Sequence, residues 1–374
     1  MSDTARYRSW MYLLRTPGLG PAGLRELLDT HQRDADAAWA ALRAGTVRLP
    51  EAARPWLRQP DEARIAADLG WLDAQDHRLL LYTDEDFPPL LEAIPQPPAA
   101  LFVVGDASLL LHPQLAIVGA RAASLGGCAH ARAFALALGQ AGFVIASGMA
   151  DGIDGAAHRA VLEAGQPTVA VIGTGPDRVY PRKHHELARR IAAQGAMVSE
   201  FPPGTAARAD HFPRRNRLLA GLALGTLIIE AGLQSGSLIT ARLAAECGRE
   251  VFALPGSIHN PLAQGCHRLI RDGARLVETA SEIVEVLTPA ALALGRELAC
   301  RLTLAVTPDG PGDADIDPGA QALLDILGDR WMTVDELATA AGQAVASLSP
   351  VLLMLELAGR VEALPGNRYQ RLQP

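Results

Sequence analysis

Lysine is almost absent from this sequence: Lys183 is the single lysine among 374 residues. A Walker A loop needs lysine between glycine and serine or threonine, and Lys183 follows Arg182, so a P-loop nucleotidase is excluded. The chain also lacks a G-x-S-x-G nucleophile elbow and an H-E-x-x-H zinc motif. Its one G-x-G-x-x-G, at residues 18–23, follows a helix-like segment instead of a strand and indicates no dinucleotide site. We therefore predict no catalytic residues.

Cysteine is scarce too. No two of the four cysteines form a C-x-x-C pair, which argues against a zinc ribbon or a disulfide framework and indicates a reducing compartment. We expect buried free thiols at Cys128, Cys247, Cys266 and Cys300. The first ten residues contain no apolar run typical of a signal peptide, and glycines and polar residues interrupt the longest uncharged stretch, 133–150. These absences predict a soluble, cytoplasmic protein without a membrane span.

Two proline-rich segments, residues 88–98 and 307–318, are typical of connectors between domains. We predict a helical domain at 1–80, a central domain at 81–290, a linker at 291–317 and a small domain at 318–374. Charge is uneven along the chain. Residues 112–290 hold 17 Lys and Arg against 14 Asp and Glu, a net charge of +3. The rest of the chain carries a net charge of −10, which gives −7 for the whole chain. The acidic remainder should repel nucleic acid while the central part could still attract it, so the net charge of the whole chain does not decide whether the partner is anionic.

The central part alternates short apolar runs with alanine-rich segments of helical length. The runs lack the polar–apolar alternation of half-exposed strands, as expected of strands buried on both faces: 115–119, 143–147, 168–173, 196–200, 226–230 and 251–256. This pattern predicts an α/β fold with a doubly wound parallel sheet, in which ligands bind beyond the carboxyl ends of the strands. Glycine and polar clusters fall at those ends, and such loops suit a phosphate. Nucleotide, nucleic acid and sugar phosphate all remain open.

The stretch DGIDGAAH contains Asp151, Asp154 and His158, whose spacing could place three metal ligands on adjacent helical turns. The simpler interpretation makes Asp151 the N-cap of a helix and Asp154 a first-turn carboxylate that offsets the helix dipole. His158 is then a buried residue that holds a neighbouring loop by a hydrogen bond. We predict no metal site.

Seven motifs, in one order over about 160 residues, resemble the DNA-processing protein A (DprA/Smf) family. They are GARAAS (119–124), SGMADGIDGAAH (147–158), VIGTGPDRVYP (171–181), SEFPPG (199–204), FPRRNRLLAGL (212–222), EAGLQSGSLITA (230–241) and ALPGSIHNPLAQGCHRLIRDGA (253–274). The resemblance implies a homodimeric, non-enzymatic protein of natural transformation with an extended Rossmann-like domain and no cofactor. Such a protein binds and protects incoming single-stranded DNA and loads RecA recombinase onto it, on strands that can carry single-strand-binding protein.

Carried over by position, the resemblance implies a nucleic-acid-binding set: Gly119, Arg121, Ser147, Gly148, Arg182, Lys183, Phe212, Arg214, Arg215, Asn216, Ser235 and Gly236. It also implies a dimer interface with Leu262, Leu269 and Ile270, although core packing would explain the same residues. Relatives often have a lysine shortly before the Phe-Pro pair, where this chain offers only Arg208.

The chemistry of the segment HFPRRNRLLAGL (211–222) agrees with strand binding. Arg121 and Arg215, placed on loops above the sheet, can each fork onto a phosphate, and Asn216 can bond to a base edge. Phe212 can stack on a base, which contributes about 1–3 kcal/mol. Alternatively, Phe212 and Pro213 open a helix as a hydrophobic staple, with Arg214 and Arg217 solvated on its outer face. We favour the second interpretation for Arg214 and Arg217, and the first for Arg121, Arg215 and Asn216.

The flanking parts resemble small modules. Residues 16–29 have the helix, G-x-G turn and helix of a helix-hairpin-helix or sterile-alpha-motif-like domain, where the turn serves either packing or phosphate binding. Residues 318–374 indicate three helices and then two strands around a turn at 364–367, a winged helix. Its expected recognition helix, 345–357, contains no arginine or lysine, so protein contact is favoured over DNA binding.

Two other functions remain open. Nucleotide phosphoribohydrolases use a glycine-rich loop with arginine and glutamate, and Arg121 with Glu230 could mimic that pair. Those enzymes resemble P-G-G-x-G-T-x-x-E, whereas Glu230 stands before the glycines of its segment. A purely structural protein without nucleic-acid affinity is the third possibility.

Overall fold

The structure is a computed structural model that describes residues 3–45, 47, 49–305, 318–328, 330–342, 348, 352, 355, 360–364 and 368–371. The chain divides into two compact units, Met1–Leu298 and Ala299–Pro374. The α-helices of the first unit are α1 (Asp3–Leu14), α2 (Pro21–Thr30), α3 (Ala35–Arg43), α4 (Arg54–Arg58), α5 (Glu62–Trp71), α6 (Pro89–Glu92), α7 (Leu125–Gln140), α8 (Ile153–Glu163), α9 (His185–Gln194), α10 (His211–Leu222), α11 (Ser237–Glu246), α12 (Gln264–Arg271) and α13 (Ala280–Ala305), the last of which continues past Leu298. Short 3-10 helices are η1 (Glu51–Ala53), η2 (Ala107–Leu111) and η3 (Arg182–His184).

The described part of the first unit is built on a nine-stranded sheet in the order β1-β2-β6-β5-β4-β3-β7-β8-β9. Its strands are β1 (His77–Leu81), β2 (Ala100–Gly105), β3 (Gln114–Val118), β4 (Val144–Ser147), β5 (Thr168–Val171), β6 (Ala196–Ser199), β7 (Gly225–Ile228), β8 (Glu250–Ala253) and β9 (Arg275–Leu276). The seven strands from β6 to β9 in this order are parallel, whereas β1 and β2 are antiparallel additions. The predicted α/β class is confirmed, and the six predicted strands are β3–β8.

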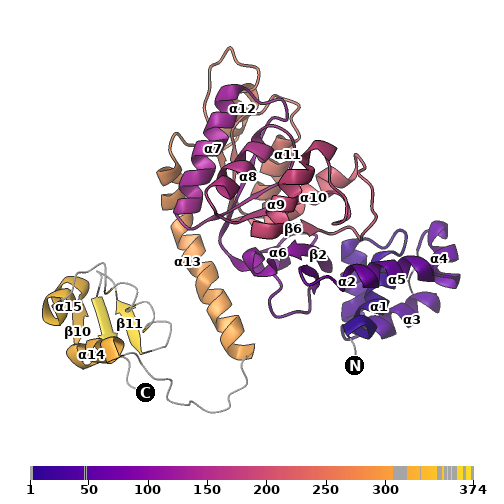
Figure 1. Ribbon diagram of the computed structural model, residues 1–374, viewed down its shortest axis with the longest axis horizontal. Helices are drawn as coiled ribbons and strands as arrows, with labels where there is room; N and C mark the ends of the chain where they lie inside the picture. Colours follow the sequence, from indigo (N-terminus) through magenta and orange to yellow (C-terminus); the bar gives the residue numbers. More distant parts are fainter. Residues whose placement is uncertain are drawn as a thin grey trace. The chain divides into compact units, whose positions relative to one another are not determined.

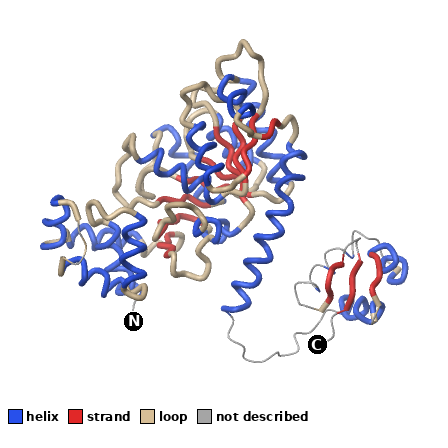
Figure 2. The backbone as a smooth tube through the Cα atoms, turned by 180° about the vertical axis from the view of Figure 1, so that it is seen from behind, coloured by secondary structure: helices blue, strands red, loops and turns tan. Residues whose placement is uncertain are grey.

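The sheet is buried on both faces, which explains why its strands lack polar–apolar alternation. Side chains of β3 point alternately into two cores: Leu115 and Ile117 pack with α7, α8 and α13, whereas Ala116 and Val118 pack with α10 and the N-terminal helices. Figures 1 and 2 show these helices on either side of the central strands.

The helical N-terminal part, α1–α5, shares a core with the sheet. Trp10 and Leu28 are buried in the same cluster as Leu101 of β2. The proline-rich segment 88–98 is therefore no connector between domains: it joins the paired strands β1 and β2 and buries Leu91. The predicted boundaries at residues 80, 290 and 317 stay predictions, and α13 makes the start of the predicted linker helical.

The order of the strands creates a topological switch point. From β3 the chain builds outward through β4, β5 and β6, and it then returns to place β7 on the other side of β3. Ligands of doubly wound sheets bind where the connections diverge in this way, beyond the carboxyl ends of the two central strands.

The second unit contains α14 (Pro318–Leu327), α15 (Val334–Ala341) and a sheet in the order β10-β12-β11, with strands Trp331–Thr333, Arg368–Arg371 and Val361–Leu364. Thr333 and Glu336 form a capping box that begins α15. Most of the predicted helix 345–357 and of the predicted turn 364–367 lies outside the described residues. The described Leu348, Leu352 and Leu355 are buried with α14 and α15, at the spacing of one helical face.

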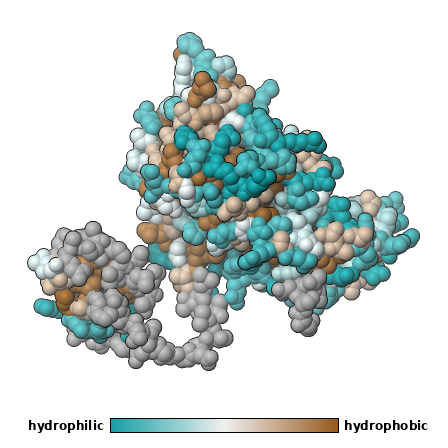
Figure 3. Space-filling view, in the orientation of Figure 1, coloured by the Kyte–Doolittle hydropathy of each residue, from teal (hydrophilic) through white to brown (hydrophobic). Residues whose placement is uncertain are grey.

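The cysteines meet the expectation in part. Cys266 is buried and Cys128 and Cys247 are half-buried, but Cys300 is exposed, so the prediction is wrong there. Within the described residues, no helix is long and apolar enough to cross a membrane. On the face of the first unit drawn in Figure 3, hydrophilic and apolar side chains are interspersed.

Candidate functional site

A cavity of about 790 Å³ lies at the switch point. Its walls are the loops after β3, β4 and β7, the start of α10 and the start of α11. Eight residues of the predicted set line it together: Gly119, Arg121, Gly148, Phe212, Arg215, Asn216, Ser235 and Gly236. We call this space the switch-point cavity.

Arg121 supplies an available positive charge in this cavity. It is exposed, and its guanidinium carbon lies 5.8 Å from the centre of the Phe212 ring. In the described part of the chain, no carboxylate forms an ion pair with it. Arg121 can therefore bind an anion without first breaking an internal ion pair.

Two aromatic side chains border the cavity. The rings of Phe212 and Tyr180 lie 5.3 Å apart at 41°, and Tyr180 is 46% exposed. Tyr180 is not in the predicted nucleic-acid-binding set, although it lies within the motif VIGTGPDRVYP (171–181). An exposed tyrosine ring and a half-buried phenylalanine ring beside an exposed guanidinium can provide both a stacking surface and a phosphate contact.

Arg215 differs from the expectation of a phosphate fork on a loop. It lies on α10 and is buried. Its Nη1 donates to the carbonyl oxygens of Gly148 (2.8 Å) and Val171, and its Nε donates to Asn216 Oδ1 (3.1 Å). Burial lowers the pKa of Arg215 to about 10, and the nearby Asp154 carboxylate opposes this shift. Arg215 lines the cavity mainly as a support for the loop after β4.

Asp154 supports the same loop from the other side. Its Oδ2 accepts hydrogen bonds from the backbone amides of Gly148 (3.1 Å) and Ala150 (3.3 Å), and burial raises its pKa against the pull of Arg215. A Cβ at Gly148 would lie 2.6 Å from Arg215 Nη1 and 2.8 Å from Asp154 Oδ2, so a larger residue would have to displace these two side chains. Ser147 is buried, does not line the cavity and donates to the carbonyl of Ile117.

The N-terminus of α11 faces the switch-point cavity. Ser235, Gly236 and Ser237 line it, and Gly236 caps the helix without a side-chain bond. The Oγ atoms of Ser235 and Ser237 lie 2.6 Å apart. The positive end of the helix dipole favours a negatively charged ligand here.

The other predicted cations lie outside this cavity. Lys183 is exposed and its Nζ lies 3.0 Å from Asp151 Oδ1. Arg182 lines a second hollow of about 430 Å³, which shares Tyr180 and Ala207 with the first. Arg214 is exposed over the ring of Phe201.

Two interpretations of neighbouring residues were wrong. Arg217 is not solvated on the outer face of α10, because it is buried and forms an ion pair with Glu200. Asp151 is not the N-cap of α8: Gly152 occupies that position, while Asp154 does lie in the first turn.

His158 is fully buried and joins neighbouring strands rather than a loop. Its Nδ1 lies 2.8 Å from Thr168 Oγ1, which donates to the carbonyl of Ile145. Because Thr168 uses its proton there, Nδ1 of His158 carries the hydrogen. Burial, reinforced by nearby cationic groups, lowers the pKa of His158 to about 3.

Glu230 does not line the switch-point cavity. Its carboxylate accepts from the amide (2.8 Å) and hydroxyl (2.5 Å) of Ser124, the N-cap residue of α7. Both carboxylate oxygens are therefore engaged in hydrogen bonds at the start of α7.

The predicted interface residues occupy mixed positions. Leu262 lines the switch-point cavity, and Leu269 and Ile270 of α12 are half-buried against the core. Their role between two copies of the chain stays a prediction.

A mostly parallel sheet with a cavity at its switch point defines an α/β protein with a Rossmann-like fold. The family model described as DNA recombination-mediator protein A matches residues 78–288, and the DprA winged helix domain matches residues 307–367. The chain belongs to the DNA-processing protein A (DprA/Smf) family.

Similar proteins cover most of the chain. Protein Smf of Escherichia coli (strain K12) is 43% identical over 317 residues, which is 83% of this chain and 81% of the relative. The X-ray structure of DprA from Streptococcus pneumoniae matches with a TM-score of 0.66 and 35% identity, covering 74% of this chain and 97% of that one. A DprA structure from Helicobacter pylori, whose description concerns its single-stranded DNA binding mode, matches with a TM-score of 0.52 and 29% identity, covering 57% and 96%.

Proposed function

We propose that this chain binds single-stranded DNA in the switch-point cavity. The observation that carries the proposal is the juxtaposition of the exposed Arg121 with the exposed ring of Tyr180 and the ring of Phe212. The single-stranded DNA binding described for the Helicobacter pylori relative supports the same assignment.

Different parts of the site bind the phosphates and the bases of the strand. Arg121 and the N-terminus of α11 hold backbone phosphates, while Phe212 and Tyr180 stack on bases. The buried pair Arg215 and Asp154 fixes the loop after β4 between them. Bases within a duplex are already stacked on each other, so a stacking site of this kind prefers single strands.

The proposed cellular role follows from family membership. We propose that the chain acts as a homodimer in natural transformation, protects incoming single strands and loads RecA onto them. The chain has no nucleotide-hydrolysis motif. Loading therefore depends on holding strand and recombinase together, with RecA's own nucleotide as the energy source.

The test is a competition assay of single-stranded against duplex DNA across a salt series. We expect single-strand preference and a logarithmic affinity that falls with slope near −0.7 per phosphate neutralised. Tight binding that salt leaves unchanged, or equal affinity for duplex, contradicts the proposal.

Nucleotide hydrolysis is the rival function, and the position of Glu230 counts against it. The carboxylate such a reaction would need is bonded to Ser124 and lies outside the cavity lining. Incubation with nucleoside monophosphates tests this alternative directly. Steady release of free base would overturn the binding-protein assignment.

A further inference from the structure

One segment of chain, residues 202–210, walls both cavities; we call it the wall segment. It leads from β6 to α10. Arg208 and Ala209 line the switch-point cavity, Ala206 lines the second hollow, and Ala207 lines both. Because residues 206–210 are exposed, the position of this wall depends on how its first half, 202–205, is anchored.

The loop after β5 anchors the first half of the wall segment on one side. The amide of Gly204 donates to Asp177 Oδ1 (2.6 Å), and the carbonyl of Thr205 accepts from the amide of Gly175 (2.9 Å). Gly204 adopts a φ of +78°, which lets the chain turn sharply here.

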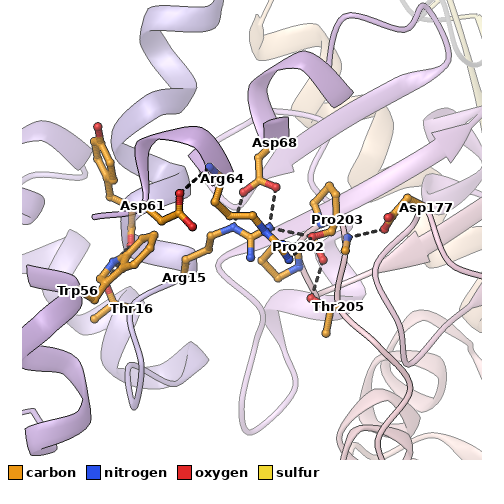
Figure 4. A network of polar contacts seen from close by, with 12 residues as sticks. Arg15, Thr16, Trp56, Asp61, Arg64, Asp68, Asp177, Pro202, Pro203 and Thr205 are labelled. Carbon is orange, nitrogen blue, oxygen red and sulfur yellow. Dashed lines mark hydrogen bonds and ion pairs between the residues drawn. The ribbon is translucent and has the colours of Figure 1, made fainter. Parts of the chain in front are cut away.

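The N-terminal helices α1–α5 supply an anchor on the other side. The carbonyl oxygen of Pro203 accepts from Arg15 Nη2 (2.8 Å) and from Arg64 Nη2 (3.4 Å). Figure 4 shows both guanidinium groups converging on this carbonyl from α5 and the end of α1. Pro203 itself is buried in this contact.

Arg15 is held rigidly for this task. Its Nη2 donates to Asp68 Oδ1 (2.6 Å) and its Nε donates to Asp68 Oδ2, a bidentate pair. Asp61 caps α5, and Arg64 and Asp68 follow on one face of that helix, one turn apart. The side chains of Arg15 and Asp68 are 12% and 2% exposed, so Arg15 is closed off from a bound strand.

We propose that the N-terminal helices α1–α5 position the wall of the strand-binding cavity through the contact of Arg15 and Arg64 with Pro203. Both arginines are positioning residues: they touch the wall segment, and the wall segment touches the ligand. For its effect on DNA the inference rests on the proposed function. A wall released from this anchor samples other positions, and affinity falls with the fraction of molecules that keep the competent one.

The test removes the anchor without leaving a buried charge unpaired. Arg15→Leu with Asp68→Leu removes both partners and leaves net charge unchanged, whereas Arg15→Ala alone would leave Asp68 buried and unpaired. The matched control is Arg8→Leu with Glu62→Leu. That pair (3.0 Å) joins the same two helices, α1 and α5, and does not touch the wall segment.

Two measurements are read together. Amide hydrogen exchange at Gly175, Gly204 and Thr205 should quicken about tenfold in the anchor variant, because local opening becomes easier. The Kd for single-stranded DNA should rise about 3- to 10-fold, the usual size of an effect carried through a contact network. The salt slope should stay unchanged, and the control variant should match the wild type in every measurement.

Several outcomes would overturn the inference. Unchanged exchange refutes the anchor, and unchanged affinity with faster exchange refutes its role in strand binding. A salt slope reduced by about 0.7 would show that Arg15 contacts a phosphate directly. If the wild type binds no strand, the proposed function fails while exchange still decides the anchoring. If the double variant does not fold, Arg64→Met removes the second donor and carries the same measurements.

Discussion

Three arginines within four residues of α10 have three different environments. Arg214 is exposed over the Phe201 ring, Arg215 is buried against backbone carbonyls, and Arg217 is paired with Glu200. Clustered charge in the sequence thus does not mean clustered charge at the surface. Arg121, which is exposed and lines the switch-point cavity, comes from a different loop.

Arg121→Ala should weaken binding to all single strands alike. A phosphate contact carries no base information, so we expect Kd to rise about tenfold, or ~1.4 kcal/mol, whatever the sequence of the strand. The salt dependence of the affinity should become shallower, with the magnitude of its slope reduced by about 0.7. Fluorescence anisotropy with several oligonucleotides at three salt concentrations measures both quantities.

The control is Arg242→Ala, which removes the same charge from the exposed face of α11, outside the cavity lining. A loss of affinity in the control as large as that in Arg121→Ala would indicate general electrostatic attraction. Strong dependence of the loss on base sequence would contradict the phosphate assignment.

His158 should make the protein sensitive to acid. Its folded pKa of about 3 lies below the ordinary value of 6.5, so the folded state binds fewer protons. This contribution to stability is complete above pH 6.5 and is lost as pH falls. The free energy of unfolding that is lost from this source between pH 7.5 and pH 5.5 is about 1.4 kcal/mol.

Urea unfolding at pH 7.5 and 5.5 measures this dependence. We expect His158→Gln to lose less stability between the two pH values than the wild type does. His130→Gln, a change at an exposed histidine of α7, should keep the wild-type dependence. Equal pH dependence in all three proteins would rule out His158 as the cause.

At the scale of elements, the sequence predicts what local pattern determines. Strands β3–β8 were predictable because runs such as 143–147 are bounded by glycine and polar residues and buried on both faces. Strands β1 and β2 were missed because a proline-rich segment separates them, and their antiparallel pairing is a long-range contact. The burial of Arg215 and the bonding of Glu230 to Ser124 were unpredictable for the same reason: their partners are remote in sequence.

Glu230 should stabilise the start of α7 rather than take part in chemistry. Glu230→Gln cannot accept both hydrogen bonds from Ser124, so we expect a loss of about 1–3 kcal/mol in the free energy of unfolding. Single-strand affinity should change little. Glu246→Gln, at an exposed position of α11, should stay within about 0.5 kcal/mol of wild type in the same denaturation assay. Wild-type stability in Glu230→Gln would argue that the carboxylate is held there for another purpose.

At the scale of the whole molecule, the chain is expected to pair through the end of the central domain. Leu269 and Ile270 of α12 are only half-buried, and a patch that meets its own copy forms an isologous interface. Leu269→Glu should yield monomers in sedimentation velocity. Leu292→Glu, at a leucine of α13 that is 62% exposed, is the control. Unchanged sedimentation of folded Leu269→Glu would assign this residue to core packing alone.

Pairing of two copies also affects the proposed loading of RecA. Two cavities on one particle raise the effective concentration of the strand, and a protein without nucleotide chemistry can promote filament formation only by such tethering. We expect the wild type to speed RecA assembly on strands coated with single-strand-binding protein. Arg121→Ala should remove this effect while direct contact with RecA, measured without DNA, persists. Stimulation that survives the loss of strand binding would make tethering the wrong mechanism, and its absence with the cognate RecA would refute the loading role for this chain.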